Sequence, residues 1–160
     1  MADWIERLAE AKAEARRASI VRQELRLHNA RIIGARLPAL WNTITEVAEA
    51  NSAELRQRFP EEKKWHCHLV RDGLCFALIN DGPLPRIELY IRPNLGGQCL
   101  DSVESIKSSM MEPASTRRHD RINVTVSDTE ELEFHYKGVT HTTPESLARA
   151  LISHTCNIPA

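Results

Sequence analysis

The chain has 160 residues, of which 21 are lysine or arginine and 22 are aspartate or glutamate, so its formal net charge is −1. This length suits one domain with a substantial hydrophobic core, and the balanced charge gives no overall basic field for nucleic acid. No apolar run approaches the ~20 residues of a membrane-spanning helix. We therefore expect one domain over residues 1–160, with helical arms in 1–59 and a sheet with a closing helix in 65–160.

The four cysteines favour a reducing compartment. None of them stands in a Cys-x-x-Cys motif, and those in predicted strands are expected to be small buried apolar groups. Met1 leads directly into a charged helical stretch, without the apolar segment of a secretory signal. The sequence therefore predicts a cytoplasmic protein.

The stretch from Asp3 to Phe59 is expected to be helical almost throughout. Asp3 can cap the first turn, and Glu6 can reach back to it as in a capping box. Alanine, leucine, glutamate and arginine, which are strong helix formers, dominate as far as Arg36. Residues 3–36 are therefore predicted to form a long first helix.

Pro38 divides this stretch, and we expect the chain to turn between Gly34 and Pro38. Proline is tolerated in the first turn of a helix, so a second and shorter helix is predicted to begin there. It should end at Phe59, because Pro60 cannot continue a helix.

Apolar residues at four-three spacing form a seam along the first helix. A helix over 3–36 would be ~50 Å long, whereas a compact domain of this size has a radius of gyration of ~15 Å. We therefore predict that a second copy of the chain covers the seam; the alternative is that the seam lies wholly in the intramolecular core. The predicted interface residues are Leu8, Ala11, Ala15, Ala18, Leu25 and Ile32.

After a charged linker, the alternation of apolar and polar residues predicts an antiparallel sheet. Asp72-Gly73 is a strong two-residue hairpin signal between the first two strands, and in that register Val70 faces Cys75. The predicted strands cover residues 65–71, 74–80, 86–92, 121–127 and 132–137.

The connection between the third and fourth strands is long, and we expect a short helix at 101–111 followed by a mobile segment at 113–119. Thr143 and Pro144 mark the start of a closing helix, as cap and first-turn proline. The predicted fold class is α+β: two N-terminal helices, a five-stranded antiparallel sheet and a C-terminal helix, with all helices on one sheet face.

The alternation of apolar and polar residues along the strands also predicts which face of the sheet is buried. One face of the first hairpin carries large apolar side chains, and burying each stabilises the fold by ~1.5–3 kcal/mol. The opposite face carries His66 and His68, so we expect it to be open to water, or covered only by a partner or by the long 94–119 loop. The residues predicted to lie under the helices are Cys67, Leu69, Leu74, Phe76, Leu78, Ile122, Val124, Phe134 and Tyr136.

Two groups of residues are candidates for binding chemistry. His66 and His68 point to the same side of a strand, and the predicted register places Cys75 beside them. Two imidazoles and a thiolate are acceptable zinc ligands, although exposed histidines and a core cysteine explain the same residues. The run Arg117, Arg118 and His119 is the candidate anion contact, with a solvated loop tip as the alternative.

No serine-nucleophile elbow or phosphate-binding loop is present, and we predict no cofactor. The first hypothesis is a non-enzymatic protein-interaction or adaptor module that forms a homodimer through its N-terminal helices. It would present the polar sheet face or the 94–119 loop to an unidentified protein partner. The second hypothesis is a small metal-dependent enzyme or ligand-binding protein that uses His66, His68 and Cys75.

Overall fold

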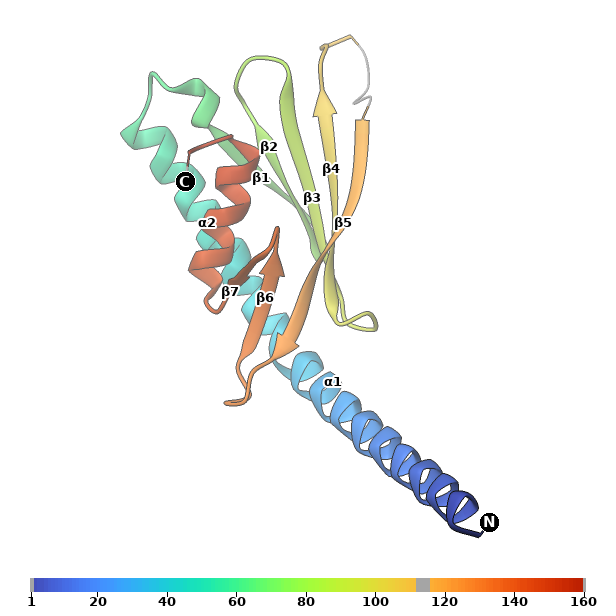
Figure 1. Ribbon diagram of the computed structural model, residues 1–160. Helices are drawn as coiled ribbons and strands as arrows, with labels where there is room; N and C mark the ends of the chain where they lie inside the picture. The colour runs from blue at the N-terminus through green and yellow to red at the C-terminus, as the bar shows by residue number, and fades with distance from the viewer. Residues whose placement is uncertain (1, 112–115, 160) are drawn as a thin grey trace.

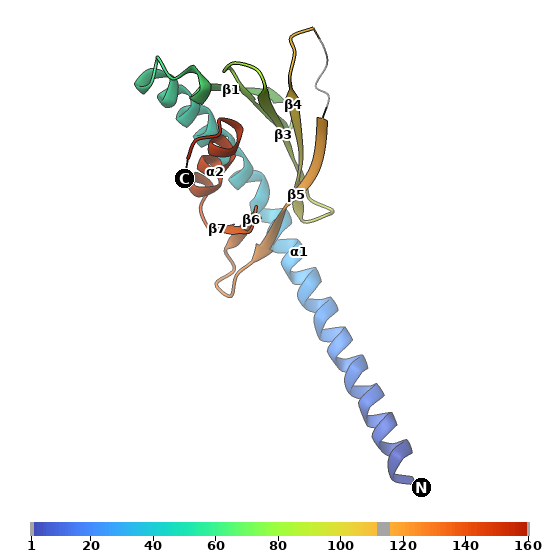
Figure 2. The ribbon, with the colours of Figure 1, turned by 45° about the horizontal axis from the view of Figure 1, so that its top comes forward.

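The computed structural model describes residues 2–111 and 116–159. One long helix and one short helix lie on the same side of a seven-stranded antiparallel sheet (Figures 1 and 2). The elements are α1 (Ala2–Arg58), the 3-10 helix η1 (Lys63–Trp65), β1 (Cys67–Asp72), β2 (Cys75–Asn80), β3 (Arg86–Asn94), β4 (Cys99–Lys107), β5 (Thr116–Val126), β6 (Leu132–Tyr136), β7 (Val139–His141) and α2 (Pro144–Thr155).

The strands follow one another in the sheet in chain order, each antiparallel to its neighbour. The sheet twists so that both β1 and β6 contact α1, and α1 also packs against α2. The expected five-stranded sheet is therefore wrong, because the sheet has two further strands, β4 and β7. The α+β class and the helices on one sheet face are as predicted.

The expected second N-terminal helix is also wrong, because α1 continues without a break through Gly34 and Pro38. A proline inside a helix costs ~3 kcal/mol, since it removes one hydrogen bond and crowds the carbonyl four residues earlier. Here that residue is Gly34, and both residues are exposed, so the unpaired carbonyl can turn toward water.

The gain from packing exceeds this cost. Ile33, Leu37, Trp41 and Ile44 form one buried stripe that runs past Pro38, and each is at most 3 % exposed. Burial of each large side chain stabilises the fold by ~1.5–3 kcal/mol. A turn at Pro38 would take the first members of this stripe off the sheet, so the continuous helix is favoured.

The predicted 101–111 helix is wrong, because most of it lies in β4. The spacing of Val103, Ile106 and Met110 resembles one helical face, but β4 is a strand whose buried positions include Ser102 and Ser105. These two small polar residues lie on opposite faces of β4, because side chains alternate along a strand, so the apolar alternation that marks a half-buried strand is missing. The segment predicted to be mobile, 113–119, lies partly outside the described residues, and its remainder belongs to β5.

The first hairpin has a different register from the predicted one. Val70 pairs with Ala77, and Asp72 pairs with Cys75, so the two-residue turn is Gly73-Leu74. Gly73 has a φ of +59°, which glycine adopts without strain. Leu74 consequently lies in the turn and is 70 % exposed, contrary to its expected burial.

The predicted buried face is otherwise confirmed. A register shift of two residues leaves every side chain on its original side of the sheet, because side chains alternate with a period of two. The core cluster includes Cys67, Phe76, Leu78, Ile122, Val124, Phe134 and Tyr136, with Leu69 partly buried against it.

Candidate interaction site

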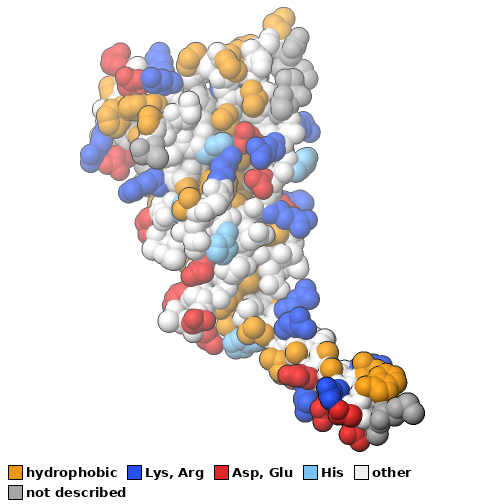
Figure 3. All heavy atoms as spheres, viewed as in Figure 1, with side chains coloured by type: hydrophobic (Ala, Val, Ile, Leu, Met, Phe, Trp, Pro, Cys, Tyr) orange, Lys and Arg blue, Asp and Glu red, His pale blue; other side chains and the backbone are white. Residues whose placement is uncertain are grey.

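The N-terminal part of α1 projects from the rest of the molecule as a free helix (Figures 1 and 2). Every residue from Asp3 to His28 is exposed, and we call residues 3–28 the arm. Apolar side chains lie among charged ones at its free end (Figure 3). Its large exposed hydrophobic residues are Trp4, Ile5, Leu8, Ile20, Val21, Leu25 and Leu27.

The base of the arm is fixed to the turn between β5 and β6. The Nε2 atom of His28 lies 3.2 Å from Oε1 of Glu130. Arg36 donates from Nη1 to the backbone carbonyl of Glu130 at 2.6 Å. Its guanidinium also lies 3.6 Å from the carboxylate of Glu131. Since the same helix continues into the buried stripe, the arm leaves the body of the protein in a defined direction.

The structure separates the predicted interface residues into two groups. Leu8, Ala11, Ala15, Ala18 and Leu25 lie on the exposed arm. Ile32 is partly buried and packs against the hydrophobic core, so it belongs to the junction between arm and body.

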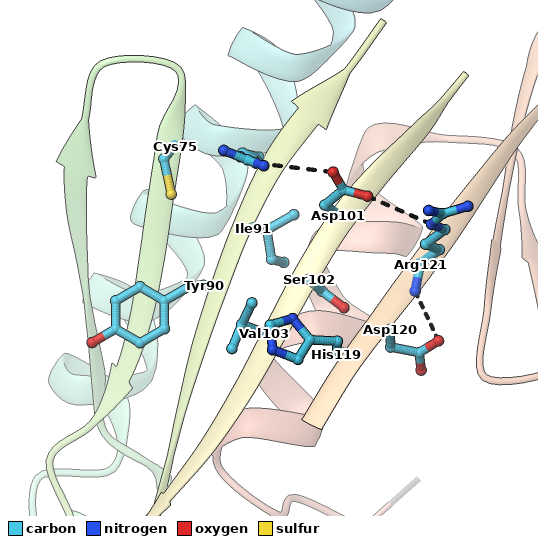
Figure 4. Close-up of a pocket in the computed structure, with 10 residues that line it drawn as sticks. Cys75, Tyr90, Ile91, Asp101, Ser102, Val103, His119, Asp120 and Arg121 are labelled. Carbon is cyan, nitrogen blue, oxygen red and sulfur yellow. Dashed lines mark hydrogen bonds and ion pairs between the residues drawn. The ribbon is translucent and has the colours of Figure 1, made fainter. Parts of the chain in front are cut away.

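A second surface is a shallow hollow of about 720 Å³ on the sheet face that points away from the helices (Figure 4). Asp101 on β4 lies at one end, 3.9 Å from Nε of Arg92 and 3.8 Å from Nε of Arg121 on the neighbouring strands. Tyr90 and His119 line its other end, on either side of Val103, with which both are paired. We call this surface the outer hollow.

The two thiols near Asp101 are not activated nucleophiles. Burial, and then the charge of Asp101, raise the pKa of Cys99 above its ordinary value. Burial, and then the charge of Asp72, raise the pKa of Cys75. Both thiols therefore stay protonated at neutral pH, whereas nucleophilic cysteines have a lowered pKa.

A third polar group lies where α2 meets the inner face of β4. Nε2 of His154 lies 2.5 Å from Oε2 of Glu104, and Nζ of Lys137 lies 3.8 Å from the same oxygen. Tyr136 packs edge-on against His154, and burial and the nearby Glu104 raise the pKa of its hydroxyl. Charged side chains and histidines gather between α2 and β5 in Figure 3. Since the charges pair with one another, this group joins α2 to the sheet.

The predicted metal ligands are not brought together. His66 precedes β1, is 8 % exposed and has Nε2 2.7 Å from the carbonyl of Phe59, so its expected exposure was wrong. His68 places Nδ1 2.6 Å from Oδ1 of Asp81. Cys75 pairs with Asp72, four residues along β1 from His68, a separation of ~13 Å. Over residues 2–111 and 116–159, no three His, Cys, Asp or Glu side chains are grouped to hold a metal ion.

The predicted anion contact is divided between the two faces of β5. Arg117 and His119 face outward with Tyr90 and Val103, whereas Arg118 pairs with Glu104 and faces the helices. The sequence pattern did not indicate the outer hollow, because Asp101 and Val103 were expected to lie on a helix. Only the pairing of β4 with β3 and β5 brings these residues beside Arg92 and Arg121.

In the part of the chain that the structure describes, no helix has both the length and the apolar character required to cross a bilayer. Comparison with known protein families, curated proteins and solved structures gives no match for this chain.

Proposed function

We propose that this protein is a non-enzymatic interaction module that self-associates through its arm. The observation that supports the proposal most directly is the exposure of residues 3–28 on a helix that is otherwise anchored in the core. Most helix stability in proteins comes from packing of an apolar face, and within one copy the large apolar side chains of the arm are exposed. A second copy that covers the Leu8 and Leu25 side supplies this packing.

The outer hollow is the surface that we propose for an unidentified protein partner. Arg92, Arg121 and His119 line it together with the acids Asp101 and Asp120, and Arg117 and Glu88 lie beside it. A partner segment that carries charges of both signs is therefore the matching chemistry. Pairing of the arms leaves this face open, because it lies on the sheet side opposite the helices (Figure 4). The four free cysteines support a reducing compartment such as the cytoplasm.

The test is the mass of the protein in solution. Light scattering during gel filtration at micromolar concentration should give twice the chain mass. Leu8→Asp combined with Leu25→Asp should give a monomer with an intact body, because a buried unpaired carboxylate is costly.

The matched control is Ile20→Asp combined with Leu27→Asp. It also replaces two exposed aliphatic side chains of the arm and adds the same charge, but on the opposite side of the helix. This control should remain dimeric. A monomeric wild-type protein would refute the proposal, as would equal dissociation of both double variants.

A further inference from the structure

We infer that two arms pair in antiparallel orientation, with Leu8 of one copy level with Leu25 of the other. This inference rests on the proposed self-association and specifies the orientation and the register of the two paired helices. It makes the arm an interface between two copies whose bodies lie at opposite ends of the helix pair.

The seam itself has the symmetry that an antiparallel pair requires. Its positions recur at alternating spacings of four and three, as in a heptad repeat. Arg22 and Asn29 stand on the same four-three line and interrupt its apolar residues. When the line from Trp4 to Asn29 is reversed about a point between residues 16 and 17, each of its positions meets another position of the line. The facing pairs are Leu8 with the partner's Leu25, Ala15 with the partner's Ala18, Ala11 with the partner's Arg22, and Trp4 with the partner's Asn29.

The buried stripe of α1 limits the register on one side. A register one heptad further along would drive residue 3 into the partner's buried stripe near Leu37. A register one heptad shorter would displace Leu25 from the partner's Leu8 by seven residues, about 10 Å along the helix.

The charges of the arm select the antiparallel orientation. Residues 3–14 carry four acids and two bases, whereas residues 16–31 carry five arginines and one acid. Antiparallel pairing lays the acidic segment of each copy along the arginine-rich segment of the other, and parallel pairing lays like charges together. Each exposed charge pair contributes little to the stability of the dimer, but these contributions all favour the antiparallel orientation over the parallel one.

The sizes of the facing side chains support the same choice. In the antiparallel pair, Arg22 lies over the partner's Ala11, and its long side chain can pass the small methyl group toward Glu10 or Glu14 of the partner subunit. In a parallel pair, Arg22 meets the same residue of the other copy at the helix interface. Two like charges held together away from water are unfavourable.

Antiparallel pairing fixes the shape of the dimer. The two copies of Ile33, where the buried stripe begins, would lie ~50 Å apart along the helix axis. Trp4 of each copy would reach the partner's Asn29, where the free arm of the partner ends. Ile20 and Leu27 lie on the other side of the helix and take no part in this contact.

Cysteine cross-linking tests the orientation. The variants are Leu8→Cys, Leu25→Cys and the double variant, oxidised under conditions in which the wild-type protein, with its four native cysteines, gives no covalent dimer. We expect the double variant to form a covalent dimer and each single variant to stay uncross-linked, because antiparallel pairing places the two copies of residue 8 ~25 Å apart. Small-angle scattering of the wild-type dimer should show two separate bodies whose centres lie more than ~50 Å apart, because each body extends outward from Ile33.

Cross-linking of either single variant with itself would overturn the antiparallel register, and so would a scattering profile of two bodies in contact. A dimer by light scattering in which no variant cross-links would also overturn it, since the seam would then not form the interface. A monomeric wild-type protein refutes the proposed self-association itself, so the two failures are distinguishable.

Discussion

The indole ring of Trp41 stacks on the phenyl ring of Phe76, with their centroids 4.8 Å apart and their planes inclined by 14°. Trp41 also donates from Nε1 to the backbone carbonyl of Leu74 at 2.8 Å. The long helix is therefore held to the first hairpin by a buried aromatic contact and by a directional hydrogen bond. These contacts help to fix the direction in which the arm leaves the body.

Replacement of Phe76 by alanine should lower the free energy of unfolding by ~3–5 kcal/mol, because it leaves a cavity beneath Trp41. Tyr90→Ala is the control, since Tyr90 lies on the neighbouring strand but is 39 % exposed on the outer face. Tyr90→Ala should lower the free energy of unfolding by less than about 1 kcal/mol. Urea denaturation of the three proteins gives the comparison, and equal losses would contradict the assignment of the two sheet faces.

Replacement by alanine should change the free energy of unfolding in opposite directions at Gly34 and at Gly73. A Cβ atom at Gly34 or at Gly73 would meet nothing within 4 Å, but Gly73 has a φ of +59°. Gly34→Ala should raise the free energy of unfolding by ~0.5–1 kcal/mol, since Gly34 lies inside a helix. Gly73→Ala should lower it by ~1–2 kcal/mol, because an L-residue is strained there. Thermal unfolding measures both, and a loss at Gly34 would argue for a break in α1.

Acidification should destabilise the protein through His141. This histidine is buried with Nδ1 2.7 Å from the hydroxyl of Ser146, and burial lowers its pKa below the ordinary value of a histidine. The unfolded chain therefore takes up this proton at a higher pH than the folded chain does. The contribution of neutral His141 to stability is complete above the unfolded pKa of ~6.5 and decreases as the pH falls below it.

The measurement is urea denaturation between about pH 7.5 and 5.5, which spans the pKa of the unfolded histidine. His141→Gln keeps a side chain that can bond to Ser146 but does not titrate. The variant should lose less stability over this range than the wild-type protein does. The same pH dependence in both proteins would show that His141 is not responsible.

Self-association should protect the arm from trypsin, which cleaves after its many arginines. A helix without a packing partner opens more often than a paired one, and cleavage follows the population of the open form. Leu8→Asp with Leu25→Asp should therefore be cut within residues 7–31 faster than the wild-type protein. Ile20→Asp with Leu27→Asp should be cut at the wild-type rate. Mass spectrometry of the first fragments locates the cuts, and equal rates in all three proteins would argue against a paired arm.

The sequence alone determined the buried face of the sheet and the helical character of the arm. Phe76, Val124 and Phe134 were placed in the core by alternation with a period of two, and that assignment survives a shift of the hairpin register by two residues. The run of strong helix formers and the four-three seam likewise depend only on neighbours along the chain. These features are local, so the sequence carries them directly.

Only the tertiary structure decided where α1 ends, how β4 pairs and where the outer hollow lies. Pro38 is a local signal for a break, but packing of Ile33 and Leu37 on the sheet outweighs it. Ser102 and Ser105 are buried on opposite faces of β4 and are not the apolar side chains that mark a buried strand. Asp101 faces Arg92 and Arg121 only because β3, β4 and β5 are paired. Each of these results depends on contacts between residues far apart in the chain, which local periodicity does not record.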